Sequence, residues 1–543
     1  MESVDDVRKK RHRGKSRASR ACEICRKQKT RCFASANSKS CLRCQTLELK
    51  CSFLDGDQVE FHAPSEPMSV ESRLENLDSN ITEVLRLLRG KRGAVIYSDS
   101  ESGLPPFGQP SLTFLTAPFN LYGSLVRSEL SPSPLTRLYN PQMVVHDQDI
   151  VSLGLISHSQ ALALLDYFKR HYNHWVSFPD GVTMSVLLDS MRRRCSLLLT
   201  VCCCVAIRYY DVNLRLKVYK HLLNRLQTEL YQSMLVVPQT IEFMQALTVM
   251  CIYASSLSEG DIIIDAWFYS GIALQHFITK DVLGLVMSFD GLEPVTEFDA
   301  LTGYRVWNHL CLVHLVNCVM SGRTCILDQA RLDLCRRTLE LTSSTNFDGR
   351  MIAEITLQYH VYSFVQNSKN LAVVEDDLRQ WRDEWSYLFE QPTEQFVEMG
   401  YHYSYFVILW HWHCSRSQSL ELSRASIGGI AEGIFENCPS SVLFRMVVHL
   451  LKVVDGLVIV KDDQYFKCLS DQLHFCGVFA ATTLSKIVNA ITQTEDIEDL
   501  PETPEDITKK LAILANRFQK ISVTPNDLIY KFGQAIMESS VVI

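Results

Sequence analysis

Six cysteines near the start of this 543-residue chain follow a repeated spacing, C-x2-C-x6-C-x8-C-x2-C-x6-C. They are Cys22, Cys25, Cys32, Cys41, Cys44 and Cys51. Tetrahedral zinc takes four thiolates, so two separate zinc sites would need more sulfurs than the six present. If two thiolates bridge, six sulfurs satisfy two ions. The matching halves make the first cysteine of each, Cys22 and Cys41, the predicted bridges. We therefore expect two Zn(II) ions per chain.

The alternative is a set of ordinary free or disulfide-linked cysteines. The opening residues, MESVDDVRKKRHRGKSRASR, contain no apolar signal segment. Nineteen cysteines without a secretion signal favour a reducing compartment, where thiols pack or bind metal. Residues 21–52 also hold too little apolar material for a core, since Leu42, Leu47 and Leu49 cannot form one. Metal binding must then supply most of the folding free energy of this segment.

Charge is divided unevenly along the chain. Residues 1–52 carry 15 Lys or Arg against 5 Asp or Glu, although the whole chain has a net charge of −7. A basic head on an acidic body predicts binding to a polyanion, with nucleic acid the first candidate. We interpret residues 1–20 as a basic disordered arm that serves nuclear import, phosphate binding or both. A merely solubilising tail is the alternative.

Residues 18–52 resemble the fungal binuclear zinc-cluster family of transcription factors. That resemblance implies a short helix after the second cysteine whose N-terminal end reads a CGG triplet in the major groove. It places Lys29 at the main base-reading position, where its ammonium can donate to guanine O6 and N7. Gln28 stands where a second basic residue is common, and Arg26, Lys27 and Arg31 are expected to contact phosphates. The family often has Pro where this chain has Lys39, which predicts an altered loop between the halves with both sets of ligands kept.

A heptad pattern follows the cysteine segment after a predicted linker at 53–68. Its apolar positions are Val70, Leu74, Leu77, Ile81, Val84 and Leu88, with alternating spacings of four and three residues. We interpret residues 69–89 as a coiled-coil dimerisation element with Leu74, Ile81 and Leu88 at the a positions. An amphipathic helix packed on the body is the alternative. A dimer would read two half-sites on DNA, although the linker leaves their spacing and orientation open.

The remaining chain consists of a predicted flexible linker at 90–149 and a long series of helical patterns at 150–543. The predicted fold is a small N-terminal binuclear zinc-cluster module and a short coiled coil, followed by a large all-α domain. Segments of the body also resemble the middle homology region of fungal zinc-cluster regulators. The match includes its arginine-tryptophan helix and Ser-Gly-Arg turn at Arg305, Trp307 and Ser321–Arg323, with Thr324 where Pro is usual. The resemblance implies a regulatory domain.

Other clusters in the body favour ordinary roles. His402, His411, His413 and Cys414 suggest a second metal site, but their aromatic helical surroundings favour histidines of the core and its rim. Cys202, Cys203 and Cys204 are consecutive on a predicted helix and point in different directions, which favours packing thiols. The apolar run Cys195–Ile207 is shorter than the roughly 20 residues that cross a bilayer, so we expect a buried helix and no membrane partner.

These patterns predict a nuclear, zinc-dependent, sequence-specific DNA-binding regulator of RNA polymerase II transcription. We expect a homodimer on paired CGG-type sites that also contacts the transcription machinery or co-regulators. The chain contains no G-x-S-x-G, Walker A, H-E-x-x-H or dinucleotide fingerprint, so we do not expect an enzyme. The alternatives are a DNA-bound repressor or scaffold without an activation segment and, less favoured, an enzyme in the helical body that the zinc module targets.

Overall fold

The computed structural model describes residues 22–27, 40–41, 44, 49–52, 116–118, 148–172, 176–178, 181–234, 236, 239–259, 262–282, 297–367, 370–390, 394–416, 438–494 and 500–540. The chain divides into two compact units, Met1–Glu101 and Ser102–Ile543. The first unit contains the short helix α2 (Glu23–Lys27). The basic arm, both predicted linkers except residues 116–118 and 148–149, and the whole heptad segment lie outside the described residues.

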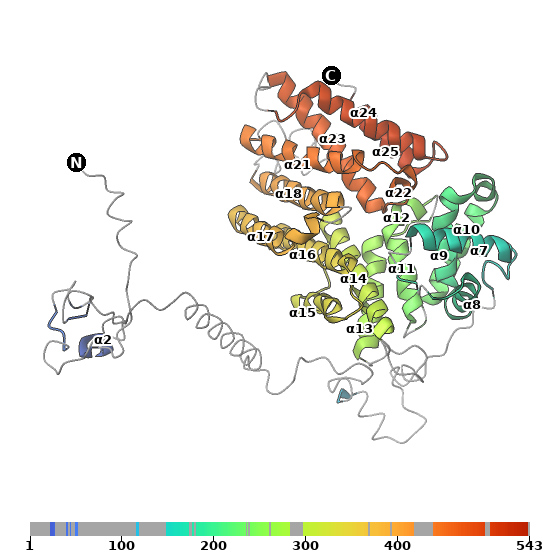
Figure 1. Ribbon diagram of the computed structural model, residues 1–543, viewed down its shortest axis with the longest axis horizontal. Coiled ribbons are helices and arrows are strands. Elements are labelled where there is room, and N and C mark those ends of the chain that lie inside the picture. Colours follow the sequence, from blue (N-terminus) through green and yellow to red (C-terminus); the bar gives the residue numbers. More distant parts are fainter. Residues whose placement is uncertain are drawn as a thin grey trace, which may run out of the picture. The chain divides into compact units, whose positions relative to one another are not determined.

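The second unit is built from helices (Figure 1). In chain order these are α7 (His158–Tyr172), α8 (Met184–Arg194), α9 (Ser196–Tyr210), α10 (Val212–Ser233), α11 (Ile241–Ile252), α12 (Ala254–Leu257), α13 (Ala266–Val282), α14 (Glu297–Ser321), α15 (Gln329–Asp333), η3 (Leu334–Glu340), α16 (Asn346–Asn367), α17 (Leu371–Glu384), η4 (Ser386–Glu390), α18 (Glu394–Arg416), α21 (Ser440–Val458), α22 (Asp463–Lys467), α23 (Asp471–Thr494), α24 (Pro504–Ile521) and α25 (Leu528–Ser540). The described residues include no named strand, which confirms the predicted fold class.

Short polar side chains begin several of these helices. Asp211 accepts a hydrogen bond from the Leu214 N–H at the start of α10, and Thr240 accepts one from the Phe243 N–H at the start of α11. Thr503 does the same for α24, where Pro504 takes the first helical position. Each side-chain oxygen satisfies one of the backbone N–H groups that have no partner inside the helix. The sequence thus sets these boundaries locally.

Two helices of the body are buried around most of their circumference. In α9 every residue from Ser196 to Arg208 is buried, and in α11 the same holds for Ile241 and for Phe243–Ile252. The predicted buried helix is therefore confirmed, and Cys202, Cys203 and Cys204 pack in the core. None of the described helices is both long and apolar enough to cross a membrane.

The helix α18 separates two hydrophobic cores. Tyr401 and Ile408 pack in the core built mainly from α7–α17, whereas Phe406 and Leu409 pack in the core built from α18 and α21–α25. Residues three, four or seven apart share one face of a helix, so Tyr401 and Ile408 lie on one face of α18 and Phe406 and Leu409 on another. A single helix therefore serves both cores. Figure 1 shows α18 lying between the yellow helices α16 and α17 and the orange-red helices of the C-terminal end.

Polar contacts join the N-terminal and C-terminal helices of the body. Asp471 at the start of α23 accepts hydrogen bonds from the backbone N–H and hydroxyl of Ser256, at 2.6 and 2.5 Å. Arg215 of α10 donates two hydrogen bonds to Asp527, at 3.1 and 2.6 Å. In each pair the two residues lie more than 200 positions apart in the sequence. These contacts therefore hold the last helices of the body against the earlier ones.

Helix α14 contains the predicted arginine-tryptophan segment and has a defined end. Arg305 donates two hydrogen bonds to the buried carboxylate of Asp348 on α16, at 2.7 and 2.8 Å, and Trp307 is buried. The helix ends before Gly322, whose φ of 68° lies in the left-handed region. Glycine adopts this conformation without the steric cost that a Cβ atom brings, and it commonly follows a helix C-terminus.

Gly533 tests the close contact between α24 and α25. A Cβ atom there would lie 2.7 Å from the Ala515 carbonyl oxygen and 2.8 Å from Gln519 Cγ. We expect Gly533→Ala to lower the free energy of unfolding by about 1–3 kcal/mol, because the backbone must move. Gly400→Ala is the control, since it lies inside α18 with no atom within 4 Å of its added Cβ. It should be neutral or stabilising by up to about 1 kcal/mol. Denaturant unfolding measures both, and equal effects would contradict the prediction.

Candidate metal centre

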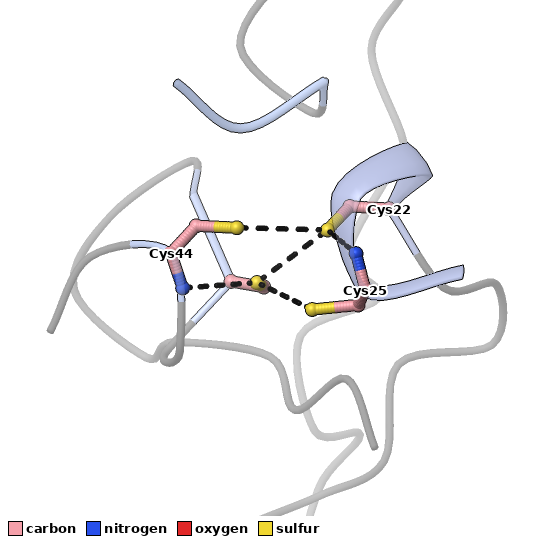
Figure 2. Close-up of side chains that lie close together, drawn as sticks. Cys22, Cys25 and Cys44 are labelled. Carbon is pink, nitrogen blue, oxygen red and sulfur yellow. Dashed lines mark hydrogen bonds between the residues drawn. The ribbon is translucent and has the colours of Figure 1, made fainter. Parts of the chain in front are cut away.

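Four cysteine sulfurs of the first unit lie around a common centre. Cys22 Sγ is 3.7 Å from Cys41 Sγ and 3.7 Å from Cys44 Sγ, and Cys25 Sγ is 3.8 Å from Cys41 Sγ (Figure 2). All four sulfurs lie within 4.8 Å of one another. A disulfide places its sulfurs about 2.05 Å apart. Two thiolates on one tetrahedral zinc ion, with bonds of about 2.3 Å, lie about 3.8 Å apart. The spacing therefore fits shared metal ligation.

The two halves of the motif have the same local geometry. The Cys25 N–H donates to Cys22 Sγ at 3.5 Å, and the Cys44 N–H donates to Cys41 Sγ at 3.4 Å. The first cysteine of each half thus accepts a hydrogen bond from the second, and it also lies beside a cysteine of the other half. This arrangement agrees with the internal symmetry from which Cys22 and Cys41 were predicted to bridge.

The backbone around the cysteines is short and tightly turned. Helix α2 begins directly after Cys22, and the Arg26 N–H donates to the Cys22 carbonyl at 2.9 Å. Cys25 is buried while Arg26 and Lys27 are exposed, so the helix presents its sulfur inward and its charges to solvent. The Glu23 N–H donates to Ser52 Oγ at 2.9 Å, which ties the start of the motif to its end.

Among the described residues, the buried centre consists almost entirely of cysteine. Cys22, Cys25, Cys41, Cys44 and Cys51 are each at most 1% exposed, and the partly buried residue that packs against them is Ile24. Burial raises the pKa of the Cys22 and Cys44 thiols above the ordinary value. Zinc binds the deprotonated thiolate and supplies the positive charge that such a buried group needs. The donor set and its spacing fit zinc.

The structure describes only part of the predicted site. Five of the six predicted metal ligands are buried together, and Arg26 and Lys27 lie exposed beside them. Cys32 and the predicted DNA-contacting residues Gln28, Lys29 and Arg31 lie outside the described residues. Their roles therefore stay predictions.

The histidine-rich segment of α18 is engaged in packing. His402 Nδ1 lies 2.7 Å from His449 Nδ1 of α21, and burial lowers the pKa of His402 to about 4 and that of His449 to about 3. The His411 ring contacts Phe364 edge to face, and His413 is buried. Within the described residues these histidines and Cys414 belong to no group of three possible metal ligands.

The body contains a second group of possible metal ligands that was not predicted from the sequence. His314, Cys318 and Cys325 place one ligand atom each within 4.8 Å of one another. The pattern H-x3-C-x6-C was visible, and residues four apart share a helix face. The third member is brought back by the turn at Gly322, which a spacing rule does not predict.

Comparison with protein families gives two matches. A family model described as the middle domain of the transcriptional activator of proteases prtT matches residues 154–538. A second model, the fungal Zn(2)-Cys(6) binuclear cluster domain, matches residues 20–58. This second domain binds two zinc ions, so the predicted cofactor is confirmed. No solved structure matches the chain.

Curated relatives are fungal transcription regulators. An uncharacterised transcriptional regulatory protein of Schizosaccharomyces pombe is 26% identical over 96% of this chain and 88% of its own length. The transcriptional activators of proteases prtT of Penicillium rubens and Aspergillus niger are 28% and 27% identical, over 68% and 69% of this chain. The alignments cover 59% and 62% of those two proteins, which is less than two thirds of their length.

The bridged arrangement predicts that substitution of a bridging cysteine lowers the zinc content, whereas substitution of a cysteine in the helical body does not. Cys22→Ser removes a sulfur that the bridged arrangement shares between both ions, so we expect the zinc content to fall by about two ions per chain. The control is Cys195→Ser, because Cys195 is a buried cysteine of the helical body. It should leave the zinc content unchanged. Elemental analysis of the purified full chain measures the ratio, and an unchanged content in Cys22→Ser would contradict the assignment.

Proposed function

We propose a specific role for this chain, which belongs to the family with the middle domain of the transcriptional activator of proteases prtT and is a zinc-cluster transcription factor. It acts in the nucleus as a homodimer that binds paired CGG-type half-sites. There it regulates genes transcribed by RNA polymerase II. The observation that carries this proposal is the group of cysteine sulfurs at 3.7–3.8 Å with Arg26 and Lys27 exposed beside it. The chain is a regulator, and its helical body needs no catalytic role.

Electrostatics explains why the basic side chains matter to DNA binding. Two zinc ions held by six thiolates form a cluster with a net charge of about −2, which repels phosphate. Attraction to DNA must therefore come from the side chains around the cluster. Arg26 and Lys27 on α2 and, from the sequence, Arg31 would contact phosphates and set the register. Lys29 would then donate to guanine O6 and N7, with Gln28 beside it.

The relatives supply a candidate direction and a candidate target. Several of them are named activators of proteases, so we propose activation of protease genes as the first effect to test. The sequence also left open a DNA-bound repressor or scaffold, which would not raise the expression of its target genes. A reporter gene behind the selected DNA site, with and without the full chain, separates the two: expression rises for an activator and falls for a repressor.

The decisive experiment is selection of random-sequence DNA by the full chain, with zinc and again with a chelator. We expect selected sequences to share paired CGG-type triplets, and selection to disappear when zinc is removed. This experiment also gives the spacing and orientation of the half-sites. Selection of the same sequences in the presence of chelator would contradict zinc-dependent recognition.

Lys29 and Lys27 should differ in what they contribute to DNA binding. We expect Lys29→Ala to cost about 1–3 kcal/mol of binding free energy and to relax discrimination at the guanines. Lys27→Ala is the matched control: it should weaken binding to all sequences similarly and reduce the slope of log affinity against log salt by about 1. Titrations of specific and mutated sites at several salt concentrations measure both. Normal discrimination by Lys29→Ala would remove the assignment.

The heptad segment should set the oligomeric state. Ile81 occupies an a position, so Ile81→Asp would bury a carboxylate at the seam, and we expect a monomer. The control Ser79→Asp adds the same charge at an outward f position and should leave the dimer intact. Sedimentation equilibrium of the full chain gives the mass. A dimeric Ile81→Asp chain would favour the alternative in which this helix packs on the body.

A further inference from the structure

The end of α14 forms a compact group of metal-binding side chains in the helical body. His314 and Cys318 lie one helical turn apart and are buried, at 0% and 1% exposed, and Cys325 returns to them after the helix ends. One ring nitrogen and two sulfurs lie within 4.8 Å of one another. Two sulfurs and a nitrogen at such separations need only small side-chain movements to share one ion. The group is far in sequence from the N-terminal cysteines and lies within the second unit.

The ring of His314 is held by hydrogen bonds at both of its nitrogens. Its Nδ1 lies 3.0 Å from Ser270 Oγ, and that hydroxyl donates its hydrogen to the Trp267 carbonyl at 3.1 Å. Since the hydroxyl has one hydrogen, Nδ1 must be the donor to Ser270, which leaves a lone pair on Nε2. Metal-binding histidines commonly hold the second ring nitrogen in this way. The lone pair on Nε2 accepts a hydrogen bond from the Ile326 N–H at 3.3 Å, a bond that an ion on Nε2 would replace.

The position of Cys325 is fixed by its own contacts and by those of the two residues before it. Arg323 forms an ion pair with Asp265, which precedes α13, and the Trp267 indole N–H donates to the Thr324 carbonyl at 3.0 Å. The Cys325 N–H donates to the Tyr362 hydroxyl at 2.8 Å. Three consecutive residues after α14, at 323–325, are thus tied to α13, to the residue before it and to α16. A site whose ligands are held in advance loses little entropy when an ion binds.

We propose that His314 Nε2, Cys318 Sγ and Cys325 Sγ bind one zinc ion, with the fourth coordination position open to solvent. Zinc suits imidazole and thiolate ligands, and sites with three protein ligands commonly keep one position for water. Two thiolates neutralise the divalent ion, so a buried site carries no net charge. Cys325 is the partly exposed member of the group, so solvent would reach the open position from its side. This zinc site is separate from the binuclear cluster.

The site would link three parts of the regulatory body. His314 and Cys318 belong to α14, Cys325 belongs to the segment after it, and Ser270 belongs to α13. An ion bound there fixes the end of α14 against α13. Because the site has three protein ligands where each ion of the binuclear cluster has four thiolates, its zinc exchanges more readily. The stability of this region then rises with the supply of zinc.

The test is the zinc content of the full chain, purified under reducing conditions without chelator. We expect about three zinc ions per wild-type chain and about two in the double variant Cys318→Ala, Cys325→Ala. The control Cys204→Ala removes an equally buried cysteine from α9 and should keep about three. Circular dichroism checks that each chain keeps its helices. Equal zinc contents in the wild type and the double variant would overturn the proposal.

A second variant keeps the proposal testable if the double variant does not fold. Cys22→Ser disables the binuclear cluster and leaves the body untouched, so it should retain about one zinc ion per chain. No bound zinc in this folded variant, or a Cys318–Cys325 disulfide in its place, would overturn the proposal. Failure of the proposed function can be told apart from failure of this zinc site. In that case the full chain would select no DNA sequence, while the body site would still hold its zinc ion.

Ser270 allows a test of the zinc affinity of the body site, which would not change if His314 only packed in the core. We expect Ser270→Ala to raise the dissociation constant of the body site for zinc about 10–100-fold, because the His314 ring loses the acceptor that orients it. Competition with a coloured zinc chelator measures this constant in the Cys22→Ser background. The control Ser363→Ala changes another buried serine, on α16, and should leave the constant unchanged. Equal constants for Ser270→Ala and its parent would contradict the proposed orientation of the ring.

Discussion

The bond between thiolate and zinc is the constraint on which the DNA-binding unit depends. The buried core of that unit, in its described part, consists of five cysteines with Ile24 beside them. So little apolar surface cannot offset the conformational entropy lost when roughly thirty residues become ordered. The metal therefore provides the folding free energy, and the basic side chains are positioned only while it is bound. Folding and DNA recognition share one requirement.

The helical body is stabilised in the opposite way. Its two cores contain ordinary apolar side chains, and α18 contributes to both. Arg305 with Asp348 and Arg215 with Asp527 hold helices that are distant in sequence. Such buried pairs define the arrangement of helices more than they add stability, since desolvation offsets much of their attraction. Removal of zinc should therefore unfold the first unit, while the apolar cores of the second unit remain packed.

The sequence predicted those features that depend on local spacing. The cysteine motif follows from its repeated spacing, and the helices of the body follow from apolar periodicity. Caps such as Asp211 and Thr503 are local too, but they were recognised only in the structure. Contacts that depend on tertiary packing were beyond it. The partner of His402 is His449, which lies 47 residues away on another helix. The His314 group was missed for a related reason, because a left-handed turn at Gly322 brings its third member back.

The binuclear cluster and the proposed zinc site of the body would have different roles in regulation. An ion that binds only the folded state stabilises it by an amount that grows with the ratio of free ion to dissociation constant. The four-thiolate sites would have the smaller dissociation constants and would stay filled over a wider range of zinc supply. The proposed three-ligand site of the body would be half filled at a higher zinc concentration, so its occupancy would change within that range. Zinc supply would then alter the regulatory body while leaving the DNA-binding unit folded on its site.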